Sequence, residues 1–141
     1  MARSPHAPLL LLAALALALA LAESPVPGQG PQVPVDADKK EKDLQRAVAF
    51  AISEYNKAIN DEFYNRLLSV VTARKLVNPG VTYFLNVEIG RTSCTKSQPI
   101  LDNCGVNYDP MLVWKQLCTF QVYIDSWTNS MSLEKYNCWN E

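Results

Sequence analysis

The chain has 141 residues, with 13 basic, 14 acidic and one histidine side chain, and its net charge at pH 7 is −1. A chain of this length supplies one domain with a single modest hydrophobic core. The charge is close to neutral and no basic patch is visible, which argues against a nucleic-acid-binding protein.

The first 22 residues have the pattern of a secretory signal peptide. Arg3 supplies a short basic region, residues 9–21 are all leucine or alanine, and small residues flank Leu21 at the cleavage position. This apolar run is too short to cross a bilayer core of about 30 Å, although a membrane anchor is the alternative interpretation. Cleavage after Ala22 would remove His6, so the mature chain would lack the commonest general base and metal ligand.

Residues 23–38 are predicted to form an extended N-terminal segment. They include four prolines and two glycines but little apolar mass, so the segment cannot build a core of its own. A passive tail and a binding arm are both compatible with this composition. A short strand at 33–35 is a further prediction.

The most regular pattern follows at residues 42–59. Apolar side chains recur there at spacings of three and four, which indicates an amphipathic helix with one buried stripe. The helix dipole favours the acidic residues near the beginning of this segment. Asn60-Asp61 is predicted to end the helix. A single helix cannot bury its own stripe, so the strand-rich sequence after Phe63 must supply a sheet.

Two long strands are predicted next, at 63–77 and 81–89. They are joined by Asn78-Pro79-Gly80-Val81, whose proline and glycine predict a type II turn with a positive φ at Gly80. Residues 81–89 alternate apolar and polar side chains except at Phe84. One face of this strand should therefore lie in the core, antiparallel to the strand before it.

Two further strands are predicted at 117–127 and 131–138, around a turn at 125–129. The stretch 95–114 is rich in turn formers and is predicted to be a loop. The fold class is therefore α+β, with an antiparallel sheet of at least four strands wrapped around one long α-helix.

Four cysteines lie in the last third of the chain, at Cys94, Cys104, Cys118 and Cys138. An even number in an exported domain implies two disulfides, for which three pairings are possible. The pairing that closes the shortest loops is preferred, namely Cys94 with Cys104 and Cys118 with Cys138, each stabilising by about 2–4 kcal/mol. If both form, no thiol remains as a nucleophile or zinc ligand, which disfavours an enzyme and leaves no cofactor or metal expected.

The mature chain resembles the secreted, type 2 cystatins, which inhibit papain-like cysteine proteases. The resemblance covers nearly all of residues 30–138, and its most telling stretch is 87–94 (VEIGRTSC). The spacing of the two cysteine pairs also matches, as do Glu54-Tyr55-Asn56 and Asn60-Asp61 at the helix and its exit. The resemblance implies five strands curled around one helix.

Cystatins bind proteases with a wedge of three pieces, and the resemblance places two of them before residue 81. The first is a glycine in the N-terminal segment, here Gly30, from which we expect little affinity. The second is a Gln-x-Val-x-Gly hairpin turn, which falls on Leu76-Val77-Asn78-Pro79-Gly80. Leu76 replaces the glutamine, Asn78 replaces the valine, and only Gly80 survives. The alternative is that Pro79-Gly80 is simply a stable turn.

The third piece is a Pro-Trp pair in the second hairpin. Trp127 corresponds to the tryptophan, while Ser126 replaces the proline. Tryptophan is among the commonest residues at binding hot spots, so Trp127 is predicted to be an exposed contact rather than a core aromatic.

A separate surface in some secreted cystatins blocks the asparagine-specific protease legumain through an asparagine at the helix exit. That residue is Asn60 here, with Ile59 in place of the usual small residue. Alternatively, Asn60 only ends the helix, because asparagine tolerates the left-handed conformation that helix ends often require.

The leading functional prediction is a secreted, extracellular, monomeric and reversible inhibitor of papain-like cysteine proteases such as the cathepsins, weakened or narrowed by the degenerate first hairpin. The alternative is a cystatin-fold extracellular protein without papain-type inhibition, which acts on legumain or another partner. The domain organisation is a signal peptide at 1–22, an extended segment at 23–38 and a cystatin domain at 39–141. Neither a membrane nor a nucleic acid is expected as a partner.

Overall fold

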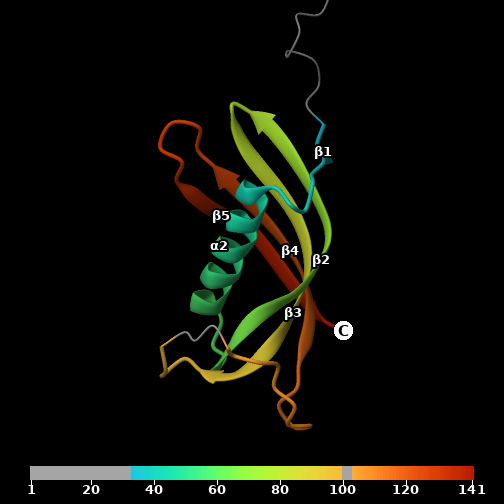
Figure 1. The fold of residues 1–141 in the computed structure, drawn as a ribbon, viewed down its shortest axis with the longest axis vertical. Helices are drawn as coiled ribbons and strands as arrows, with labels where there is room; N and C mark the ends of the chain where they lie inside the picture. Colours follow the sequence, from blue (N-terminus) through green and yellow to red (C-terminus); the bar gives the residue numbers. More distant parts are fainter. Residues whose placement is uncertain (1–32, 100–102) are drawn as a thin grey trace, which may run out of the picture. The chain divides into compact units, whose positions relative to one another are not determined.

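The computed structural model describes residues 33–99 and 103–141, so the predicted signal peptide and Gly30 lie outside the described residues. The elements in chain order are β1 (Val35–Asp36), α2 (Lys42–Ala58), β2 (Phe63–Asn78), β3 (Gly80–Thr95), β4 (Lys115–Ile124) and β5 (Met131–Asn140). The strands form one antiparallel sheet in the order β1-β2-β3-β4-β5 (Figure 1). The predicted α+β class, with a five-stranded sheet and one long helix, is confirmed.

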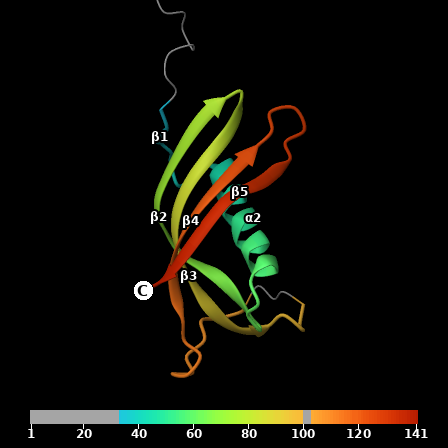
Figure 2. The ribbon, with the colours of Figure 1, turned by 180° about the vertical axis from the view of Figure 1, so that it is seen from behind.

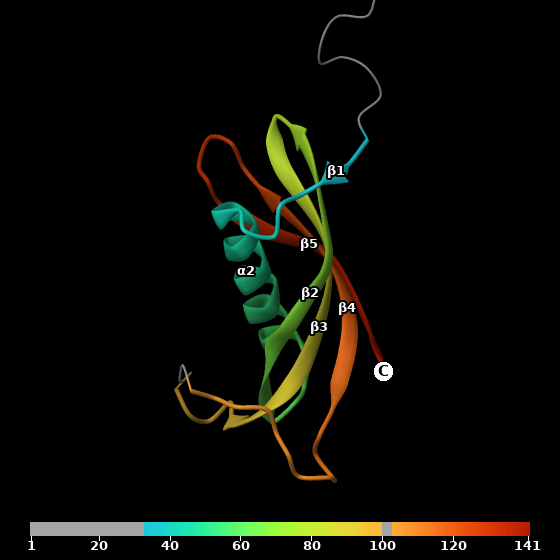
Figure 3. The same cartoon turned by 45° about the vertical axis from the view of Figure 1, so that its right-hand side comes forward.

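Helix α2 lies against one face of the sheet, and the sheet curves around it (Figures 1 and 3). The buried residues of α2 are those of the predicted stripe: Leu44, Ala47, Val48, Ala51, Ile52 and Tyr55. The facing core residues of β3 and β4 are Tyr83, Leu85, Val87, Ile89, Phe120, Val122 and Ile124. The helical period and the alternating strand period therefore meet in one core, as the sequence predicts.

Strand β2 is long and irregular, because its pairing with β3 shifts register at three places along its first half. At the last two shifts β2 has one residue more than β3 between successive pairs, whereas at the first shift the additional residues belong to β3. Such insertions bend a strand and increase its twist. These irregularities account for the incomplete alternation in the sequence of β2. They also let a strand of 16 residues follow the curvature around the helix.

The disulfides pair Cys94 with Cys104 and Cys118 with Cys138, as predicted, and no cysteine is free. The first ties the loop after β3 to the end of that strand. The second joins residues that face each other on β4 and β5. One disulfide therefore closes the start of the β3–β4 connection onto β3, and the other crosslinks the β4–β5 hairpin.

Several strand ends differ from prediction. β3 continues to Thr95 rather than ending at residue 89, β4 begins at Lys115 rather than at residue 117, and β5 ends at Asn140 rather than at residue 138. β4 ends at Ile124 rather than at residue 127, because Asp125 begins the connecting loop. The first strand is Val35–Asp36 rather than 33–35, and it pairs with β2 through Val35 and Asp36.

The outer face of the sheet, seen in Figure 2, is not covered by any other element of the described residues. No helix within the described ranges is long and apolar enough to cross a membrane.

Candidate functional site

The two hairpins with predicted contact residues lie at one end of the sheet (Figures 1 and 2). β2 and β3 are joined through Pro79, and β4 and β5 are joined by the loop 125–130. Val81 at the beginning of β3 pairs with Ile124 at the end of β4, so the register brings the two connections close together.

The first hairpin is tight, because β2 and β3 remain paired up to Asn78 and Gly80 and Pro79 alone forms the turn. Val77 is 56% exposed, and Asn78 and Pro79 are also exposed, whereas Leu76 is half-buried. Val77 and Pro79 therefore present exposed apolar side chains on either side of Asn78.

The predicted type II turn at this hairpin is wrong, because Gly80 does not have a positive φ. A Cβ atom at Gly80 would lie 2.5 Å from the carbonyl oxygen of Ile124 and 2.5 Å from the hydroxyl oxygen of Tyr123. Such distances are far below van der Waals contact, and the Ile124 oxygen belongs to the backbone. The glycine is therefore required by the close approach of β4 and not by its own conformation.

A polar cluster supports the base of the first hairpin. The carboxylate of Glu41, just before α2, accepts hydrogen bonds from Lys75 Nζ on β2 and from the Tyr83 hydroxyl on β3, the latter at 3.0 Å. The hydrogen bond from Lys75 lowers the pKa of Glu41, whereas burial raises the pKa of Tyr83. This carboxylate joins the beginning of the helix to both strands of the hairpin.

The second hairpin displays an indole on a well-ordered loop. Trp127 is 92% exposed, as the sequence predicts, while its backbone N–H donates to Asp125 Oδ1 at 2.7 Å. The N–H of Thr128 donates to the same oxygen at 3.1 Å. These backbone hydrogen bonds, led by that of Thr128, lower the pKa of Asp125, so its carboxylate is ionised at neutral pH.

The predicted legumain-binding residue lies at the other end of α2 from the hairpins (Figure 1). The helix ends at Ile59, which has an extended conformation (φ −94°, ψ 151°) and donates its N–H to Tyr55. Asn60 is exposed and does not have a positive φ; Asn129 is the one non-glycine residue in the described ranges that does. The interpretation that asparagine is needed at residue 60 because the helix end is left-handed there is therefore wrong.

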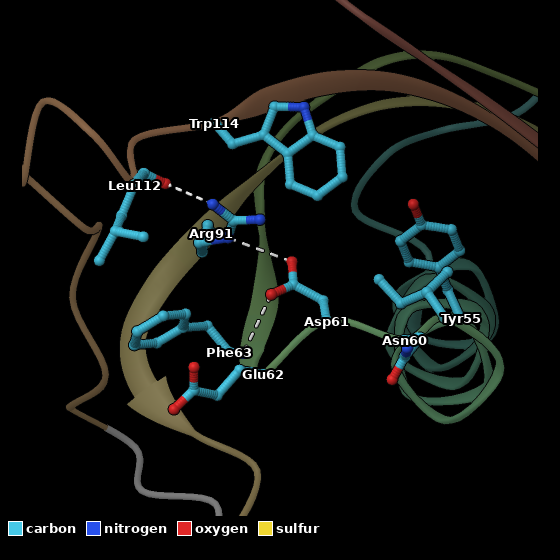
Figure 4. Close-up of a pocket in the computed structure, with 9 residues that line it drawn as sticks. Tyr55, Asn60, Asp61, Glu62, Phe63, Arg91, Leu112 and Trp114 are labelled. Atoms are coloured by element: carbon cyan, nitrogen blue, oxygen red, sulfur yellow. Dashed lines mark hydrogen bonds and ion pairs between the residues drawn. The ribbon is translucent and has the colours of Figure 1, made fainter.

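The residue after Asn60 is anchored by a half-buried ion pair (Figure 4). Asp61 Oδ2 accepts a hydrogen bond from Arg91 Nε at 3.1 Å, and the two side chains are only 6% and 19% exposed. The Arg91 guanidinium also donates to the carbonyl oxygen of Leu112 at 2.8 Å and lies 4.6 Å from the Trp114 ring. One arginine thus links the helix exit, β3 and the loop before β4.

A cavity of about 450 Å³ opens between these groups, lined by Tyr55, Ile59, Asn60, Asp61, Glu62, Phe63, Arg91, Leu112 and Trp114. Three aromatic side chains, Tyr55, Phe63 and Trp114, contribute to its walls. Among its charged residues, Arg91 and Asp61 form an ion pair. Within the described residues no three side chains of the metal-ligating types are grouped. Both ends of the described sheet present exposed residues in their connecting loops.

A model of the cystatin domain matches residues 33–127, about two thirds of the chain. The chain belongs to the cystatin family. Cystatin-C of Bos taurus is 50% identical over 146 residues, which cover 98% of this chain and 99% of the relative. Cystatin-C of Macaca mulatta is 52% identical over 99 residues, which cover 70% and 68% of the two chains.

Among solved structures, dimeric human cystatin F superposes with a TM-score of 0.72 over 84% of this chain and 96% of that one. The sequence identity in that comparison is 23%, so it supports the fold. Members of the cystatin family inhibit cysteine proteases, and membership supports this general role for the present chain.

In this cystatin, sequence reasoning and structure agree on where the hairpin residues lie but differ on what holds them. The hairpin 76–80 and the loop of Trp127 lie at the same end of the sheet, whereas Asn60 follows the opposite end of α2. The sequence did not indicate the anchoring roles of Asp125, Glu41 and Arg91. Asp125 could have been found, because aspartate at the beginning of a turn commonly accepts the N–H two residues later.

Proposed function

We propose that this chain is a secreted, reversible inhibitor of papain-like cysteine proteases that binds through Gly30, the 76–80 hairpin and Trp127. It acts as a monomer, without a cofactor, by filling the substrate groove of the protease rather than by chemistry of its own. The mature protein begins after a signal peptide at 1–22.

The observation that carries the proposal is the exposure of the Trp127 side chain. A tryptophan that is 92% exposed on a hydrogen-bonded loop offers a large apolar surface with a polar N–H to a binding partner. Tryptophan is also one of the residues that most often dominate binding energy. The loop that carries the indole lies at the same end of the sheet as the first hairpin, where Val77 is a second exposed apolar side chain.

The first hairpin supports weak or narrow inhibition rather than broad inhibition. Leu76 is half-buried and Asn78 places a polar amide at the tip, so neither reproduces the motif of the family. Loss of a well-packed contact typically weakens binding by about 1 kcal/mol or more, so two replacements weaken it by about tenfold to several hundredfold.

The test is titration of the mature, oxidised protein against papain, together with Trp127→Ala. We expect Trp127→Ala to weaken inhibition about 30-fold, the factor for a hot spot of about 2 kcal/mol. Trp139→Ala is the matched control, because Trp139 is 47% exposed but lies near the opposite end of β5. No inhibition by the unmodified protein at micromolar concentration would refute the proposal.

A second candidate function, inhibition of legumain, is supported by the geometry of the helix exit. Asn60 is exposed, its conformation does not require asparagine, and Asp61 beside it is fixed by Arg91. An asparagine displayed on a rigid loop is what an asparagine-specific protease would bind.

For this second function, Asn60→Ala should abolish inhibition of legumain and leave inhibition of papain unchanged. Asn137→Ala, an exposed asparagine on β5, is the control. Equal inhibition of legumain by the unmodified protein and by Asn60→Ala would exclude the helix exit as the contact.

A further inference from the structure

The loop between β4 and β5 is closed by one residue, Asp125. Besides the two N–H groups that its side chain binds, its own N–H donates to the carbonyl oxygen of Ser130 at 2.9 Å. Its carbonyl oxygen accepts the N–H of Asn129, also at 2.9 Å. Asn129 has φ 58°, the left-handed conformation that asparagine tolerates.

These hydrogen bonds fix the backbone of the loop and leave the indole free. All four involve main-chain groups of residues 125–130, while the Trp127 side chain is 92% exposed. A hydroxyl pair, Thr128 Oγ1 and Ser130 Oγ at 2.8 Å, closes the far side of the loop. The arrangement is that of a rigid support for one projecting side chain.

A restraint of this kind is needed because Ser126 precedes the tryptophan. A proline at that position would fix φ near −65° and reduce the number of conformations open to the unbound loop. Serine does not supply this restraint. The ionised carboxylate of Asp125 supplies it instead, because hydrogen bonds from N–H groups to a charged acceptor are stronger than neutral ones.

We propose that Asp125 is a positioning residue for protease binding, whose carboxylate fixes the backbone at Trp127 and Thr128 and so holds the indole ready to enter the groove. The inference rests on the proposed inhibitory function. In this chain, Asp125 restrains the loop backbone in the way that a proline at residue 126 would.

The expected effect is on association. When only a fraction of the free molecules has the binding-competent loop, the apparent affinity falls by that fraction. We expect Asp125→Ala to weaken inhibition of papain about tenfold, mainly through slower association, because the loop must then be ordered during binding. Asp125→Asn keeps the Oδ1 acceptor and should restore most of the affinity.

Two further variants separate positioning from other effects. Ser126→Pro in the Asp125→Ala background should recover affinity, since the Ser126 N–H donates no hydrogen bond to any described residue and its loss is harmless. Asp109→Ala is the matched control. Asp109 Oδ1 accepts the N–H of Met111 at 2.9 Å in the loop before β4, so its loss should leave papain inhibition unchanged.

Hydrogen exchange of the Trp127 and Thr128 amides in the free protein measures the restraint directly. The proposal predicts faster exchange in Asp125→Ala, together with weaker inhibition that asparagine or proline rescues. It is overturned if Asp125→Ala inhibits as tightly as the unmodified protein, or if neither substitution rescues it. If the unmodified protein does not inhibit papain, the proposed function fails, and unchanged amide exchange in Asp125→Ala would then show separately that Asp125 does not hold the loop.

Discussion

The loop that carries Trp127 and the helix exit that carries Asn60 are fixed in different ways. The Trp127 loop is held by hydrogen bonds within its own six residues, all of them near solvent. The helix exit is held by contacts with distant parts of the chain, through a half-buried ion pair and a guanidinium stacked on Trp114.

The two ends should therefore respond differently to substitution. A locally restrained loop can lose its order while the fold stays intact, so damage should appear in binding. An end built on long-range contacts is part of the folded core, so damage there should appear in the free energy of unfolding. Substitutions at the two ends can test this separation.

The largest effect is expected for Arg91→Met. The substitution leaves the carboxylate of Asp61, which is 6% exposed, without its charged partner, and breaking a buried pair in this way typically costs about 3–5 kcal/mol. Urea denaturation measures the loss. Arg46→Met is the control, because Arg46 pairs with Asp43 at the surface and should contribute about 0.5 kcal/mol or less. A loss of similar size in both variants would remove the contrast between the two ends.

Gly80→Ala should come next, and it tests the hairpin end. The added Cβ would overlap the Ile124 carbonyl oxygen, and a forced shift of packed backbone costs about 1–3 kcal/mol. Gly105→Ala, where a Cβ meets no atom within 4 Å, should be nearly neutral. Thermal or urea unfolding of the two variants decides the matter, and equal stabilities would show that β4 can move away from the turn.

A smaller, pH-dependent effect is expected at Glu41. Its pKa is lowered from 4.5 by the hydrogen bond from Lys75, so the native state favours the ionised form. Glu41 therefore stabilises the fold at pH values above 4.5, and this contribution is lost as the pH falls through the lowered pKa. Unfolding measured between pH 6 and 2 should show Glu41→Gln less stable by about 0.5–1 kcal/mol at the upper end, with the gap closing below 4.5. If the difference in free energy of unfolding between the two proteins did not change with pH, the ion pair between Glu41 and Lys75 would be contradicted.

The smallest effect on stability is expected for Trp127→Ala, within about 0.5 kcal/mol, as for exposed positions in general. The same variant should lose most of its papain inhibition. If it instead unfolds markedly more easily, the indole contributes to the fold and the two ends are more alike than their contacts indicate.

The sequence predicts the architecture well because the fold depends on periodic burial. The apolar stripe of α2 and the alternation of β3 indicate which side chains face the core. The cysteine spacing indicates the disulfides. The wedge positions follow from resemblance to a family, and whether they bind a protease remains a prediction.

The anchoring contacts were not predictable in the same way. Arg91 and Asp61 are 30 residues apart, and their pairing depends on how the helix exit returns to β3. The reason for Gly80 was also missed, because the usual signal of a Pro-Gly turn is positive φ, whereas the actual cause is the approach of β4 from more than 40 residues away.

The packing at Gly80 has a consequence for how this protein can change. Because a Cβ at residue 80 would overlap the backbone of β4, Gly80 cannot be substituted without a shift of that strand, whichever enzyme the loop meets. The presence of glycine at residue 80 is then explained by packing and carries no information on inhibitory potency. Anyone building a library to retarget this hairpin should randomise the four preceding positions and leave the glycine alone.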